Sequence, residues 1–184
     1  VTVAKHDIFL KEKNKETYRI FILGASSSVG FPYKNATTFD LALKYQLAHL
    51  FPKKNIEVIN LSLTAVCSFT LLDFAAEIPQ YEPDLIVIYA GHNEYYGALG
   101  VGSSSTLGSN RFITKILIKA RKLKVYQAIS GLISNKKNEN SRSKKLEDKQ
   151  LMERMAAKKS IVYGSSTYKK GIDQYRRNMG EVCE

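Results

Sequence analysis

Three short apolar segments in the first half of the chain constrain its fold more than any other feature of the sequence. They are residues 18–23 (YRIFIL), 56–61 (IEVINL) and 84–89 (DLIVIY), and a loop of small or polar residues follows each one. Short runs rich in Ile, Val and Leu are typical of strands that are buried on both faces of a parallel sheet. The three segments therefore predict three strands of one such sheet.

Two stretches between these segments have the pattern of helices that cover a sheet. In residues 39–50 the apolar positions recur every three or four residues, as in an amphipathic helix, and they are Phe39, Leu43, Leu47 and Leu50. Residues 68–78 predict a second helix, which ends at Pro79. Strand, helix, strand, helix, strand with short connections is the order of a doubly wound α/β sheet.

All of the chain's excess positive charge lies in its second half. The 184 residues contain 28 Lys and Arg against 17 Asp and Glu, and residues 111–159 hold 15 of the former and 4 of the latter. Residues 112–133 predict a basic amphipathic helix, and residues 134–150 predict a mobile segment. Because Phe112 and Tyr126 are the only aromatic residues of this region, base stacking is poorly supported and no nucleic-acid partner is expected. A solvated insertion and a segment that binds an anionic polymer or membrane surface are the two interpretations.

These patterns organise the chain as a single domain. We interpret residues 1–184 as one incomplete α/β domain, with its motif-bearing core in residues 18–98. Residues 111–159 are a helical or disordered basic insertion, and residues 160–184 return to the core with a helix over residues 168–179. Because the sequence does not begin with Met and stops soon after this helix, we expect a piece of a longer protein, truncated at its C-terminus.

The loop after the first expected strand carries the sharpest candidate for chemistry. It reads GASSSVG over residues 24–30 and places Ser26 near the start of a helix, where a ligand reaches its hydroxyl and its backbone N–H can stabilise an anion. A tight turn that only needs small residues is the plainer interpretation. A third, the glycine-rich nucleotide loop of short-chain dehydrogenases, requires glycine where Ser28 stands and a Tyr followed four residues later by Lys. None of the 11 tyrosines has that partner.

The loop after the third expected strand places further polar groups at the same edge of the sheet. Residues 91–97 read GHNEYYG. The amide of Asn93 can reach an oxyanion beside Ser26 if the first and third strands are neighbours. In isolation, an Asn in a turn more often bonds to its own backbone. His92 stands next to Asn93 and is a candidate ligand contact.

In three blocks the sequence resembles the SGNH/GDSL-type hydrolases. The family's Gly-Asp-Ser-x-x-x-Gly block is matched by residues 24–30, its Asn and oxyanion-glycine block by residues 60–65, and its Gly-x-Asn-Asp block by residues 91–94. Together the blocks cover roughly residues 18–98. The GHNEYYG run is similar to that of bacterial SGNH-like proteins that carry helical repeats elsewhere in the chain. The resemblance implies a flavodoxin-like three-layer α/β/α fold with a parallel sheet.

Carried onto this sequence, the resemblance gives three residues a role. Ser26 is the nucleophile, and its backbone N–H is one oxyanion donor. Ala65 stands where the family has glycine and supplies a second backbone N–H, provided that the turn does not require a positive φ. Asn93 supplies a side-chain N–H.

The base that the resemblance implies is missing from this sequence. A serine hydroxyl needs a neighbouring base to become a useful nucleophile, and the family's base is a His three residues after an Asp. None of His6, His49 and His92 has Asp at that spacing. We expect the Asp-x-x-His block to lie beyond Glu184, and the 184 residues alone to be nearly inactive.

The function implied by the resemblance is that of a serine esterase or acyl-transfer hydrolase that acts on acyl or acetyl esters, including esters of carbohydrates. The alternative is a non-catalytic module that binds a glycan or peptide on the same fold. Neither a cofactor nor a metal is expected, since Cys67 and Cys183 are far apart and no CxxC or Cys/His cluster is present. The resemblance also implies an extracytoplasmic or membrane-anchored bacterial protein, with the helical-repeat region of the same parent chain as a partner.

Overall fold

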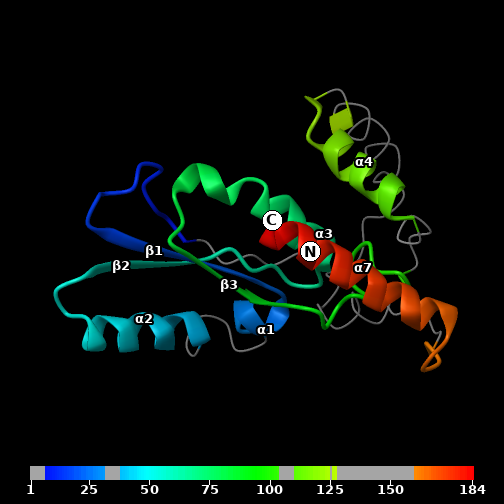
Figure 1. Ribbon diagram of the computed structural model, residues 1–184, viewed down its shortest axis with the longest axis horizontal. Helices are drawn as coiled ribbons and strands as arrows, with labels where there is room; N and C mark the ends of the chain where they lie inside the picture. The colour runs from blue at the N-terminus through cyan, green and yellow to red at the C-terminus, as the bar shows by residue number, and fades with distance from the viewer. Residues whose placement is uncertain (1–6, 32–37, 104–109, 125, 128–159) are drawn as a thin grey trace, which may run out of the picture.

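The fold is given by a computed structural model of the chain, which describes residues 7–31, 38–103, 110–124, 126–127 and 160–184 (Figure 1). Its elements in chain order are β1 (Thr17–Gly24), α1 (Ser26–Val29), α2 (Phe39–Leu50), β2 (Asn55–Asn60), α3 (Ser68–Ala75), the 3-10 helix η1 (Ile78–Tyr81), β3 (Leu85–Tyr89), α4 (Arg111–Arg121) and α7 (Ser166–Cys183). Strands and helices alternate along the first half, as the sequence pattern predicts.

β1 is the central strand of a three-stranded parallel sheet, with β2 on one side and β3 on the other. Ile22 of β1 lies opposite Asn60 of β2 and opposite Val87 of β3. The expected α/β class and parallel sheet are therefore confirmed. The first and third strands are neighbours, which is the condition on which Asn93 was placed near Ser26.

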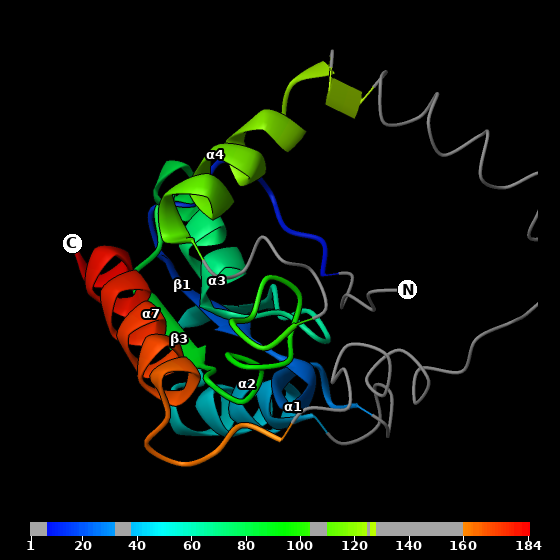
Figure 2. The same ribbon diagram turned by 90° about the vertical axis from the view of Figure 1, so that its right-hand side faces the viewer.

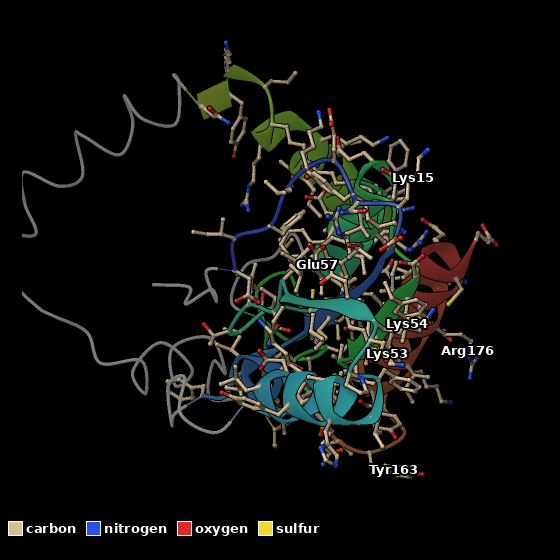
Figure 3. The ribbon with its side chains drawn as sticks, turned by 90° about the vertical axis from the view of Figure 1, so that its left-hand side faces the viewer. Lys15, Lys53, Lys54, Glu57, Tyr163 and Arg176 are labelled. Atoms are coloured by element: carbon tan, nitrogen blue, oxygen red, sulfur yellow. The ribbon has the colours of Figure 1, made fainter. Side chains whose placement is uncertain are left out.

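Because the strands are parallel, their carboxyl ends all lie at one edge of the sheet and their amino ends at the other. Figure 2 looks onto the carboxyl edge and shows α1 together with the loops that follow β2 and β3. Figure 3 looks onto the amino edge, where the exposed Lys15, Lys53 and Lys54 precede β1 and β2. Ligand sites in such sheets form at the carboxyl edge, so these lysines lie at the wrong end to take part in the expected site.

Helices cover both faces of the sheet. In Figures 1 and 2, α1 and α2 lie on one face, and α3 and α7 lie on the other. The buried core lies on the α3 side and consists of Phe21, Leu23, Ile59, Leu71 and Ile78. Phe21 and Leu23 are two residues apart in β1 and so point to the same face. Full burial of each such side chain stabilises the fold by about 1.5–3 kcal/mol.

A fully buried Arg19 joins β1 to three other segments. Its Nε donates to Glu57 of β2 at 2.7 Å, and its Nη atoms donate to the carbonyl oxygens of Tyr81 at 2.9 Å and Leu10 at 3.0 Å. Its guanidinium carbon lies 5.4 Å from the centre of the Phe9 ring. A charge is tolerated in the interior only when its donors are paired. These bonds therefore fix the N-terminal segment and the entry to β3 against the central strand.

Two helices differ from the sequence prediction. The helix expected over residues 68–78 is shorter, because α3 ends at Ala75 and the chain continues as η1 around a proline, which has no N–H to extend an α-helix. The apolar stripe expected to face the sheet from α2 is buried only in part. Phe39 and Leu50, at its two ends, are 38% and 66% exposed, and among the described strands β2, which α2 contacts, lies at the edge of the sheet.

The two later helices are near their expected positions. α7 extends beyond the expected residues 168–179 at both ends, and the Ser165 hydroxyl accepts a backbone hydrogen bond in its first turn. α4 begins after Asn110, whose side chain caps it in the same way, but it ends at Arg121 and is shorter than the helix predicted over residues 112–133. Residues 128–159, with the expected mobile segment, lie outside the described residues, and so does His6.

Candidate functional site at the carboxyl edge of the sheet

Hydrogen bonds hold together the three loops that follow β1, β2 and β3. The buried Asn60, at the end of β2, donates from Nδ2 to the carbonyl oxygen of Ser28 at 2.8 Å, and its Oδ1 accepts the N–H of Ser62 at 3.0 Å. The N–H of Ala98 donates to the carbonyl oxygen of Ala65 at 2.9 Å. The first loop is thus tied to the second, and the second to the third, so the loops that carry Ser26, Ala65 and Asn93 form one structure.

Ser26 is the first residue of α1 and is partly exposed. The preceding turn requires glycine at Gly24, because a Cβ there would lie 2.1 Å from the Oγ of Ser28 and 2.7 Å from the carbonyl oxygen of Tyr89. Within the described residues, no hydrogen bond engages the hydroxyl or the backbone N–H of Ser26. The turn therefore presents Ser26 at the carboxyl edge with both groups available to a ligand.

Ser28, in the same loop, corrects one step of the sequence argument against a nucleotide loop. That step required glycine at this position, because a side chain directed at the ligand would crowd a bound phosphate. The side chain is instead fully buried against Gly24, with its Oγ directed at the carbonyl oxygen of Tyr89. The case against a dehydrogenase-type loop now depends on the missing Tyr and Lys pair alone.

The turn after β2 places Ala65 at a φ of +59°, in the left-handed region. The condition set for alanine at this position, that the turn needs no positive φ, is therefore not met. An L residue in this conformation costs roughly 1–2 kcal/mol, which glycine avoids. Among the described residues, the N–H of Ala65 has no acceptor. The turn thus keeps a backbone shape that suits glycine, with an unused N–H.

Asn93 is buried, with 6% of its surface exposed, and its Nδ2 has no hydrogen-bond partner in the described part of the chain. The backbone carbonyl oxygen of Asn93 accepts the N–H of Gly97 at 2.7 Å. A Cβ on Gly97 would lie 2.6 Å from the Cβ of Asn93 and 3.2 Å from the carbonyl oxygen of Ala65. Asn93 and Ala65 therefore flank the same glycine. The alternative in which the Asn93 side chain only bonds to its own turn is not what the structure shows.

The structure brings no described histidine into hydrogen-bond contact with Ser26. His92 is exposed, and its ring packs edge-on against Tyr89 with 5.1 Å between the ring centres. His49 is exposed in the last turn of α2. Neither is placed as the base that a serine nucleophile needs.

A buried polar network on the other side of Asn93 escaped the sequence analysis. Glu94 is 3% exposed and accepts three hydrogen bonds: from the N–H of Ser68 at 3.0 Å, from the Ser68 hydroxyl at 2.6 Å and from Nε2 of Gln174 at 2.7 Å. Nδ2 of Asn178 donates to the Ser68 hydroxyl at 2.8 Å. Gln174 and Asn178 are four residues apart on α7 and so share a helix face. The sequence signal that could have revealed the network is this pair of polar residues at helical spacing on the buried face of α7.

Cys67 lies beside this network as an inert thiol. Burial, and then the negative charge of Glu94, raise the pKa of Cys67 to about 12. Its Sγ donates to the carbonyl oxygen of Ala98 at 3.0 Å. The thiolate, which is the reactive form, is therefore absent at neutral pH. In the residues that the structure describes, no three His, Cys, Asp or Glu side chains are grouped to hold a metal ion.

A hollow of about 190 Å³ lies between α4, α7 and the far end of the loop that follows β3. Its lining residues are Val101, Arg111, Lys170, Asp173, Gln174 and Arg177. Gln174 connects it to Glu94, but neither the Ser26 loop nor Ala65 lines it. The hollow is therefore separate from the candidate site.

In comparisons with known proteins, no family model, curated protein or solved structure matches this chain. A functional conclusion therefore depends on the three motif blocks and on the geometry of the loops that carry them.

Proposed function

We propose that the chain carries the nucleophile and the oxyanion donors of an SGNH-type serine hydrolase that acts on acyl or acetyl esters, including esters of carbohydrates. Three features support the proposal. The motif blocks resemble the family in order and spacing, they follow three neighbouring parallel strands, and they present hydrogen-bond donors that the described residues leave unused.

The observation that carries the proposal is the unpartnered amide of Asn93. A buried donor without an acceptor destabilises a fold by about 1–3 kcal/mol, so such groups are rare unless a ligand uses them. Two further unused donors, the backbone N–H groups of Ser26 and Ala65, belong to the other two loops. Donors held ready before the substrate arrives are what a developing oxyanion requires.

In the proposed reaction the Oγ of Ser26 attacks the carbonyl carbon of an ester while a base takes its proton. The negative oxygen of the tetrahedral intermediate accepts hydrogen bonds from the N–H of Ser26, the N–H of Ala65 and Nδ2 of Asn93. Collapse of the intermediate expels the alcohol, which receives the proton from the base, and leaves the acyl group on Ser26. Water or a sugar hydroxyl then attacks the acyl group, gives its proton to the base, and the Ser26 hydroxyl is restored.

The described residues do not supply the base that takes the proton of Ser26. His49 and His92 are exposed and do not hydrogen-bond to Ser26, and the sequence contains no Asp-x-x-His. A protein that carries out this reaction at a useful rate therefore needs such a segment in addition to these 184 residues. Without it, the nucleophile and the oxyanion donors give only a residual rate.

Imidazole added as an external base tests the proposal. The assay measures hydrolysis of p-nitrophenyl acetate, corrected for imidazole alone, by the wild-type chain and by the Ser26→Ala and Ser27→Ala variants. Ser27 is the matched control, because it is the adjacent serine of α1 and is exposed. We expect imidazole to raise the rate for the wild type and Ser27→Ala, and not for Ser26→Ala. Equal rates for all three proteins would contradict the proposal.

A second candidate, a module that binds a glycan or peptide without catalysis, is favoured by the absence of a described histidine in contact with Ser26. The amide of Asn93 can donate to a carbonyl or hydroxyl oxygen of a ligand without any base. In that case, Ser26→Ala keeps its affinity for the ligand and imidazole rescues no activity in any variant.

A further inference from the structure

The helix α4 is oriented with its charged side toward the protein. Arg111 and Lys115 both form ion pairs with Glu181 of α7. Directly after the helix end, Lys122 forms ion pairs with Asp73 of α3 at 2.8 Å and with Glu77 at 2.5 Å, and hydrogen bonds to Asp73 and then Glu77 raise the pKa of Lys122. Ion pairs thus attach α4 to the body of the protein.

The apolar side of α4 consequently faces outward. Phe112 is 72% exposed, Ile116 49% and Leu123 61%. Phe112 and Ile116 are four residues apart and so lie within about 40° of each other around the helix. Leu123 follows two residues after the helix ends at Arg121. Ile113, 43% exposed, widens the same stripe. An amphipathic helix normally buries this side, so α4 presents an apolar surface that the rest of the described chain leaves uncovered.

Positive charge borders this apolar stripe. Residues 111–127 contain six Lys and Arg and no acidic residue. Three of the six, Lys119, Arg121 and Lys124, are exposed and form no ion pair with a described carboxylate. An apolar face that contains Phe and Leu, with Lys and Arg beside it, is the pattern of helices that lie in the surface of an anionic membrane.

We propose that α4 binds the surface of an anionic lipid bilayer through the stripe formed by Phe112, Ile113 and Ile116, together with the exposed Leu123 just past its end. The charge distribution favours this occupant over the others. A second copy of the same surface would bring like charges together, and nucleic acid would meet apolar side chains where it requires cations. The described chain contains no helix with the length and apolar content to cross a bilayer, which is consistent with α4 lying along the surface.

Partitioning of the whole chain onto vesicles tests this inference. The vesicles are phosphatidylcholine with or without phosphatidylglycerol, and the proteins are the wild type, Leu123→Asp and Leu50→Asp. Leu50 is the matched control because it is 66% exposed but lies on α2, on the opposite face of the sheet (Figure 1). We expect Leu123→Asp to lower the partition coefficient on anionic vesicles at least tenfold, which is about the contribution of one buried Leu. Leu50→Asp leaves it unchanged.

A charge variant gives a second test that does not disturb the apolar stripe. Lys119→Gln and Lys124→Gln are each expected to weaken binding to anionic vesicles by about fivefold, and added salt is expected to weaken wild-type binding. The proposal is overturned if the wild type does not bind anionic vesicles, or if Leu50→Asp weakens binding as much as Leu123→Asp. It is also overturned if Leu123→Asp disrupts self-association in sedimentation while vesicle binding stays unchanged, because a second copy then covers the stripe.

Discussion

A comparison of Asn60 with Asn93 distinguishes an asparagine that stabilises the fold from one whose amide is held ready for a ligand. Both side chains are buried, with 0% and 6% of their surface exposed. Both ends of the Asn60 amide are bonded: its Nδ2 donates to the carbonyl oxygen of Ser28, and its Oδ1 accepts the N–H of Ser62. Nδ2 of Asn93 has no described partner. Leu has a side chain of similar shape to Asn. Replacing either asparagine by Leu therefore keeps the shape but removes different interactions at the two sites.

The size of each effect follows from these bonds. Asn60→Leu removes two hydrogen bonds and leaves the carbonyl oxygen of Ser28 and the N–H of Ser62 buried without partners. Because each orphaned group costs about 1–3 kcal/mol, we expect a loss of about 2–5 kcal/mol in the free energy of unfolding. Asn93→Leu removes a donor that is already unsatisfied, so its gain and any strain from the larger side chain offset each other to within about 1 kcal/mol.

Urea unfolding followed by circular dichroism measures both variants against the wild type, with the slope of the transition checking that each still unfolds in a single cooperative step. The reasoning is refuted if Asn93→Leu is as destabilising as Asn60→Leu, because the Asn93 amide would then be part of the folded framework. Asn93→Leu is also expected to abolish the imidazole-rescued hydrolysis, so that activity is lost while stability is kept.

Three further predictions concern the fold around the site. Ala65→Gly relieves the positive φ and is expected to raise the free energy of unfolding by up to about 1 kcal/mol, and a decrease in urea unfolding would contradict the strain at this turn. Arg19→Lys cannot reproduce the forked bonds of the guanidinium and is expected to lower stability by about 2–4 kcal/mol, whereas a change below about 0.5 kcal/mol would show that those bonds contribute little. Hydrogen bonds from Lys115 and then Arg111 lower the pKa of Glu181 below its usual 4.5, so its contribution to stability is present above that pH and is lost as the pH falls through the lowered pKa. The melting temperature of Glu181→Gln is therefore expected to lie below that of the wild type at about pH 7, and the difference is expected to shrink as the pH falls below 4.5 and through the lowered pKa of Glu181. A difference that stays constant with pH would contradict the ion pairs.

The three strands and the parallel sheet that they form were accessible to sequence reasoning because their signal is local. Residues 18–23 and 84–89 are mostly apolar, and such runs are typical of strands that a parallel sheet buries on both faces. The extent of the sheet was not accessible in the same way. Phe39 and Leu50 are exposed although they belong to the apolar stripe of α2, and the hydrophobic period of a helix does not reveal how far the sheet beneath it extends.

For the candidate site, the sequence indicates which residues reach the carboxyl edge but not how they are held there. The turn that places Ser26 is predictable from glycine and serine after a strand. The positive φ of Ala65 is not, because alanine gives no warning of it. The contacts of Glu94 with Ser68 and Gln174 join residues that are 26 and 80 positions apart, and no local pattern reports such pairings.

The most direct test of the account is to locate the acetyl group after the chain is incubated with p-nitrophenyl acetate and digested for mass spectrometry. An activated ester acylates Ser26 even without a good base, and the acyl group then persists because its hydrolysis needs the same base. We predict acetylation of Ser26, none of the neighbouring Ser27, and a large reduction of the Ser26 signal in Asn93→Leu. Acetylation confined to lysines, with Ser26 unmodified, would contradict the role of Ser26 as the nucleophile.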